Sequence, residues 1–118
     1  PVNIKFVNAY KKYAIDHKLP NADKVVTNDP MEATYVGINM WKQAVEKAGS
    51  TDVDKVRAAM AGQSFAAPSG YTLTMDAENH HLHKPVMIGQ IRADGQFDVV
   101  YKTKDTIKAE PWSPYIPK

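Results

Sequence analysis

The stretch NDPMEATYVGINMWKQAVEKAG, residues 28–49, predicts one long helix whose two ends are both marked in the sequence. Asp29 stands where an N-cap acid is expected, Pro30 takes the first helical position and Glu32 lies three residues past the cap, which is the capping-box pattern. Gly49 is the residue type that most often ends a helix. We expect the buried face to carry the apolar residues at helical spacing, which are Met31, Tyr35, Ile38, Trp41, Val45 and Ala48.

Shorter helices are predicted on either side of this stretch. Residues 3–17 form the first, with an aromatic stripe at helical spacing made of Phe6, Tyr10, Tyr13 and His17. Thr51, with Asp54 at the third position, predicts the cap of another helix that runs toward Gly62. Its apolar residues are Val53, Val56 and Met60. Because only Gly49 and Ser50 separate this helix from the long one, the two should form an αα-hairpin.

The hydrophobic period changes from helical to alternating after Gly62. Tyr71, Leu73 and Met75 alternate with polar residues and predict a half-buried strand. Residues 86–93 and 96–103 predict two further strands joined by Asp94-Gly95 in a tight two-residue hairpin. The final residues, 104–118, are rich in proline and should lie extended, held in place by Trp112 and Tyr115.

The predicted fold class is therefore α+β, with helices followed by antiparallel strands. Its parts are a helical portion at 1–62, the strands with their hairpin at 63–103 and the extended tail at 104–118. Three strands make a thin sheet for the apolar helix faces described above. We expect either the remainder of a larger fold or a second copy in a homodimer to cover them.

Composition excludes several classes of function. Hydrophobic residues make up 43% and charged residues 24% of the 118 positions, which is typical of a folded globular chain. The net charge of +2 is spread along the chain, which argues against nucleic acid as a partner. No apolar run approaches the length of a membrane span. The absence of cysteine excludes disulfides and thiolate chemistry, and from the start at Pro1 we expect a chain that was processed, trimmed or expressed in this shortened form.

Five blocks of sequence, in order, carry a resemblance to a known family. They are residues 28–35 with 41–49, residues 67–70, residues 79–86, residues 93–97 and residues 111–115. Together they resemble the C-terminal part of the periplasmic urea and short-chain-amide binding proteins that serve ABC importers, relatives of the branched-chain amino-acid binding proteins.

The resemblance implies that residues 1–118 belong to a type I periplasmic binding protein, a two-lobed α/β fold that closes on its solute. It implies a periplasmic location, an ABC permease as partner and a small polar solute, either urea, a short amide or an amino acid. A cytoplasmic amide-sensing regulator of the same fold remains an alternative.

The candidate ligand-binding residues are Met31, Glu32 and Tyr35, because the family places this helix start near the solute cleft. A glutamate there accepts hydrogen bonds from the NH₂ groups of urea or an amide. The competing reading assigns Glu32 to the capping box and Met31 and Tyr35 to the core, and we favour it from the pattern alone.

His80, His81 and His83 form the one cluster of metal-ligand residue types. His81 and His83 would share a face of an extended segment, with Asp76 or Glu78 as a third ligand. We expect no metal site, since His17 is remote, although a small interaction or metal-binding module that uses this loop is a further alternative. Carboxylates stand singly and no phosphate loop or serine–histidine pair occurs, so we expect neither an enzyme nor a cofactor.

Overall fold

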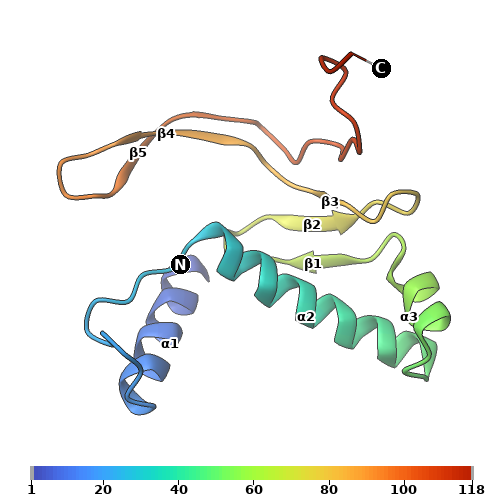
Figure 1. Cartoon of the computed structure of the whole chain (residues 1–118), viewed down its shortest axis with the longest axis horizontal. Helices are drawn as coiled ribbons and strands as arrows, with labels where there is room; N and C mark the ends of the chain where they lie inside the picture. Colours follow the sequence, from blue (N-terminus) through green and yellow to red (C-terminus); the bar gives the residue numbers. More distant parts are fainter. Residues whose placement is uncertain (1, 118) are drawn as a thin grey trace.

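The long helix α2 (Asp29–Ala48) organises the molecule, and the computed structural model describes residues 2–117 around it (Figure 1). Two other helices, a three-stranded sheet and a separate two-stranded hairpin complete the α+β fold predicted above. The other elements are α1 (Val2–Asp16), α3 (Val53–Met60), β1 (Ser64–Ala66), β2 (Thr72–Met75), β3 (Leu82–His83), β4 (Met87–Ile91) and β5 (Phe97–Lys102).

Helix α2 begins one residue earlier than its sequence pattern predicts. Asn28, with an extended backbone, is the N-cap, and its Oδ1 accepts a hydrogen bond from the Met31 amide at 3.0 Å. Asp29 and Pro30 are already helical, so the capping box assigned to Asp29 and Glu32 is wrong. The other end is confirmed, since Gly49 closes the helix in a left-handed conformation at φ 59°.

The buried face of α2 also differs from the prediction. Val36, Met40 and Ala44 are fully buried, whereas Ile38 is 63% exposed and Trp41 is 51% exposed. Both sets have helical spacing, because neighbouring residues on a helix point about 100° apart and α2 carries two apolar faces. The face that contacts β1 and α3 is the one that becomes core.

Two clusters form that core. In the first, Val36 and Met40 pack with Ala67 and Leu73. In the second, Ala44 packs with Val56 and Ala59, which joins α2 to α3 as the predicted αα-hairpin. The cap of α3 is Asp52 and not Thr51, since the Asp52 Oδ1 accepts from the Lys55 amide at 3.1 Å.

Helix α1 contacts the rest through aromatic side chains. The Phe6 ring meets Tyr35 of α2 edge-on, with ring centroids 5.1 Å apart. Tyr13, a member of the predicted aromatic stripe, is exposed and stacks on His17 at 3.8 Å between centroids, and Ala14 is the buried residue of this helix.

The three-stranded sheet is antiparallel in the order β1-β2-β3. The predicted strand at residues 71–75 is confirmed as β2, whose Leu73 is buried and pairs with Phe65 of β1. Strands β1 and β3 have three and two residues and were not predicted, because such short strands show no alternating pattern.

The predicted hairpin is confirmed as β4 and β5, with a longer turn than expected. Ile91 pairs with Phe97, and the Arg92 amide donates to the Gln96 carbonyl at 2.8 Å, which leaves three residues in the loop. Gly95 adopts φ 79°, the left-handed position that a three-residue hairpin loop requires. Asp94-Gly95 thus predicts the hairpin correctly and its loop length incorrectly.

The hairpin and the tail extend away from the core (Figure 1). The tail is tied down at its start, where the Ile107 amide donates to the Lys84 carbonyl at 2.9 Å and Asn79 Nδ2 donates to the Ala109 carbonyl at 3.1 Å. Trp112 and Tyr115 are 79% and 93% exposed, so the prediction that they hold the tail is wrong for this chain. The surfaces on which they would pack are not provided by residues 2–117.

Candidate functional site

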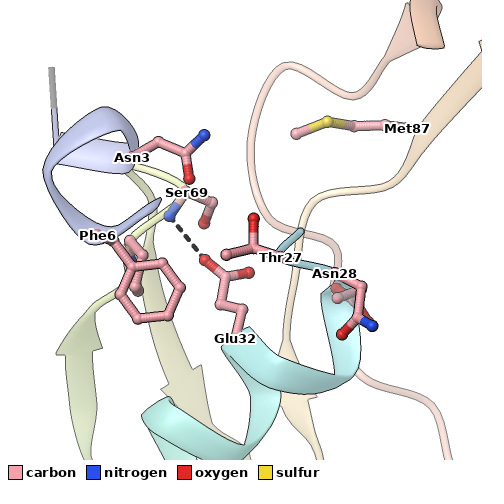
Figure 2. Close-up of a pocket in the computed structure, with 9 residues that line it drawn as sticks. Asn3, Phe6, Thr27, Asn28, Glu32, Ser69 and Met87 are labelled. Atoms are coloured by element: carbon pink, nitrogen blue, oxygen red, sulfur yellow. Dashed lines mark hydrogen bonds between the residues drawn. The ribbon is translucent and has the colours of Figure 1, made fainter. Parts of the chain in front are cut away.

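A cavity of about 290 Å³ lies where the first turn of α2 meets α1, the β1–β2 turn and the start of β4 (Figure 2). The chain segments that form it are far apart in sequence and are brought together by the core beneath. Its lining residues are Asn3, Phe6, Thr27, Asn28, Asp29, Glu32, Pro68, Ser69 and Met87.

Glu32 is the central polar group of this cavity. Its Oε1 accepts a hydrogen bond from the Ser69 amide at 2.6 Å, across 37 positions of sequence. Figure 2 shows the carboxylate between the Phe6 ring and Thr27, with its second oxygen turned away from Ser69. Glu32 therefore fixes the β1–β2 turn against the helix and presents its remaining acceptor positions to the cavity.

The other two predicted ligand-binding residues lie outside this cavity. Met31 is half-buried, and its amide is the one capped by Asn28. Tyr35 stands between Phe6 and Phe65, with centroid distances of 5.1 and 6.1 Å. Tyr35 thus packs against the Phe6 ring without lining the cavity itself. The roles of Met31, Glu32 and Tyr35 in ligand binding remain predictions.

Asn3, Thr27 and Ser69 are polar lining residues that the sequence did not indicate. Asn3 lies in a helix predicted only for its aromatic stripe, and Ser69 lies in the block at residues 67–70, which carries the family resemblance but no site assignment. No sequence signal links either of them to Glu32, because their proximity depends on how α1 and the β1–β2 turn pack on α2.

A second hollow of about 500 Å³ adjoins the first and shares Asn3, Thr27 and Asn28 with it. It runs along α1 toward the tip of the β4–β5 hairpin, where Gln96 and Phe97 line it. We treat the two neighbouring hollows as one groove because they share these three lining residues; Glu32 lines its first part and the hairpin its second.

An ion pair ties the wall of this groove to the sheet. Lys84 Nζ, next to β3, lies 2.7 Å from Asp29 Oδ1 in the first turn of α2. The charge of Asp29 is therefore matched within the structure, whereas the Glu32 carboxylate contacts a neutral amide. This leaves Glu32 as the uncompensated charge on the cavity wall among the described residues.

The histidine loop between β2 and β3 is organised by Asp76. This buried carboxylate accepts hydrogen bonds from His83 Nε2 at 3.0 Å and from the Glu78 and Asn79 amides at 2.9 and 3.1 Å. The bond from His83, followed by those from Asn79 and Glu78, lowers the pKa of Asp76 from 3.8 to about 2. Asp76 is thereby a structural centre for the loop.

Within residues 2–117 no three histidine, aspartate or glutamate side chains gather at the spacing of a metal site. His83 is held by Asp76, while His81 is exposed and bonds through its backbone to Asn79 Oδ1 at 2.8 Å. If the loop were a zinc module, zinc would raise the melting temperature, and changing His81 and His83 to alanine would abolish that rise.

The low pKa of Asp76 predicts a loss of stability in acid. Because the pKa is lowered on folding, the stabilisation is complete above pH 4 and is lost as the pH falls through about 2. We expect the difference in melting temperature between the wild-type chain and Asp76→Asn to be largest above pH 4 and to shrink toward pH 2. Circular dichroism melts from pH 5 to pH 2 measure this, with the exposed Asp23→Asn as control. A difference that stays constant over this range contradicts the prediction.

Comparison with known proteins identifies the family of this chain. Residues 1–118 match the periplasmic binding protein domain, and the chain belongs to that family. A protein named limonene hydroxylase, from Geobacillus stearothermophilus, is 38% identical over 112 residues, which cover 94% of this chain and 19% of that protein. The chain thus spans about a fifth of the length of this curated relative. Among the described residues, no helix is long and apolar enough to cross a membrane.

Proposed function

We propose that this chain supplies part of the solute cleft of a two-lobed binding protein for an ABC importer, and that its solute is urea or a short-chain amide. Membership of the periplasmic binding protein family supports solute capture in general. The observation that carries the finer assignment is the cavity at Glu32, whose carboxylate has acceptor positions left over after binding the Ser69 amide.

The proposed mechanism is capture without bond-making. The N–H groups of a planar amide or urea donate hydrogen bonds to the Glu32 carboxylate. Its carbonyl oxygen accepts hydrogen bonds from Asn3 or Thr27, which replace those from water. The Phe6 ring and Met87 form the apolar walls of the cavity. Closure of the second lobe over the groove then excludes solvent from these bonds.

The partners and location follow from the same proposal. The complete protein works in the periplasm and delivers its solute to a membrane permease, and it is not an enzyme. The relative named for limonene hydroxylation shares only the segment that matches the binding-protein family, so we assign that segment a binding role.

Isothermal titration calorimetry with urea, acetamide, leucine and limonene tests this function. The titrations use the two-lobed protein that carries this chain, alongside the 118-residue chain by itself. We expect saturable binding of urea or acetamide to the two-lobed protein and none of limonene. Binding of limonene alone, or of none of the four, would overturn the proposal.

By itself, the chain should form a homodimer. Its accessible surface of 9061 Å² exceeds the roughly 6,400 Å² expected for a closed protein of this mass, and its radius of gyration of 17.0 Å exceeds the expected value of about 13.5 Å. The excess, about 2,700 Å², is larger than a standard protein interface buries. Apolar side chains exposed on β4 and β5, including Val99 and Tyr101, contribute to it.

Multi-angle light scattering measures this association. We expect a dimer at micromolar concentration for the wild-type chain and a monomer for the double variant Val99→Lys, Tyr101→Lys, because two charges on each hairpin repel across the interface. Val53→Lys, at an exposed site on α3, is the control and should remain dimeric. A wild-type chain that stays monomeric at high concentration refutes the homodimer.

A further inference from the structure

The charges around the Glu32 cavity are unbalanced. Among residues 2–117, its lining includes two carboxylates, Asp29 and Glu32, and no lysine, arginine or histidine. The Asp29 charge is matched by Lys84 at 2.7 Å from outside the lining. Glu32 receives one backbone amide and no cation from the described residues, so one negative charge remains on the wall.

Besides Lys84, the part of the chain that the structure describes offers a helix N-terminus and Lys11 as positive contributions near the cavity, and neither cancels this charge. The N-terminal end of helix α2 carries the equivalent of about half a unit of positive charge, which is less than the full charge of a carboxylate. Lys11 is exposed and lines only the adjoining hollow, where water and salt screen it. The cavity therefore keeps a net negative potential.

An aromatic ring also lines the cavity. The Phe6 ring lines it beside the carboxylate (Figure 2), and the negative face of an aromatic ring attracts a cation placed over it. The Tyr35 ring packs against Phe6 edge-on and keeps this face in place. A planar cation with several N–H donors would meet the ring and the carboxylate together.

We propose that, at the solute site of the proposed function, the cavity prefers a small planar cation of the guanidinium or amidinium class over neutral urea. Urea and guanidinium have nearly the same size and shape, and they differ in charge and in the replacement of the carbonyl oxygen by a third NH₂ group. The uncompensated carboxylate favours the ion, because hydrogen bonds between two ionised groups are stronger than those to a neutral donor. Anions and zwitterionic amino acids are disfavoured at the same wall.

Calorimetric titration of the two-lobed protein with guanidinium chloride and with urea, both at low millimolar concentration and matched ionic strength, tests this preference. We expect guanidinium to bind at least 10-fold more tightly than urea. The variant Glu32→Gln should abolish the preference, because it removes the charge and keeps the side-chain shape. Glu46→Gln, which removes a carboxylate from the exposed face of the same helix, should leave it unchanged.

The outcomes separate this inference from the proposed function. Urea binding as tightly as guanidinium, or more tightly, overturns the preference and leaves solute capture intact. A preference for guanidinium that survives Glu32→Gln also overturns it, since the charge of Glu32 would not be its source. Failure of urea, acetamide and guanidinium alike to bind overturns both proposals.

Discussion

Replacing Met40 with alanine should lower the free energy of unfolding by about 2–5 kcal/mol, the range measured when a large buried side chain is truncated. Met40 is fully buried in the cluster with Val36 and Leu73, and the alanine leaves a void that the rigid α2 and β2 backbones cannot fill. Ala67 belongs to the same cluster and adjoins the β1–β2 turn, so the packing of the cluster also determines where Ser69 lies. Thermal melting followed by circular dichroism is the suitable measurement, because urea and guanidinium are both candidate ligands.

Ile38→Ala is the matched control for this substitution. Ile38 lies on the same helix and belongs to the face that the sequence pattern predicts as core, yet it is exposed. We expect its melting temperature to stay near that of the wild-type chain, since alanine has a higher helix propensity and little packing is lost. If Ile38→Ala destabilises as strongly as Met40→Ala, the assignment of the buried face is wrong.

Replacing Glu32 with glutamine should weaken solute binding by roughly 10- to 100-fold, as expected for the loss of a hydrogen bond to a charged acceptor. The carboxylate also accepts from the Ser69 amide at 2.6 Å, and the neutral glutamine oxygen accepts this bond more weakly, so the variant also loosens the β1–β2 turn. The loss of the charged acceptor and the loosening of the turn both weaken solute binding. Calorimetric titration of the two-lobed protein with its best ligand from the urea, amide and guanidinium set measures the change.

Glu46→Gln again serves as the control, because it removes a carboxylate of α2 that pairs with the exposed Lys42 on the helix surface. Its affinity for the solute should equal that of the wild type. A Glu32→Gln protein that melts normally and binds with unchanged affinity would show that Glu32 only fixes the turn.

The elements that local sequence specifies were predictable. Gly49 ends α2, Asp94-Gly95 forms the hairpin turn, and the alternation around Leu73 marks β2, because each signal lies within a few residues of the structure it determines. The buried face of α2 was not predictable in this way. Apolar residues at both Met40 and Trp41 give two helical stripes, and only the contact with β1 and α3 decides between them.

The site was predictable only in part. Glu32 was a candidate because the family resemblance places this helix start near the cleft, although the pattern alone favoured a capping role, and the structure places Glu32 on the cavity wall. The capping pattern suggested the wrong partner, because Asn28 takes the cap and frees the Glu32 side chain to reach Ser69. The contact between Glu32 and Ser69, 37 positions apart, depends on how the β1–β2 turn packs on α2. Local sequence patterns do not predict that packing.

The central claim is that solute binds in the cavity that Glu32 and Ser69 line, and the Ser69 amide proton reports on it directly. Its resonance in a ¹H–¹⁵N NMR spectrum should be displaced by the short hydrogen bond to Glu32. Titration of the two-lobed protein with urea or guanidinium should move this resonance saturably, with the same dissociation constant as calorimetry gives. A Ser69 resonance that stays still while the solute binds, with shifts confined to other parts of the protein, would contradict the account.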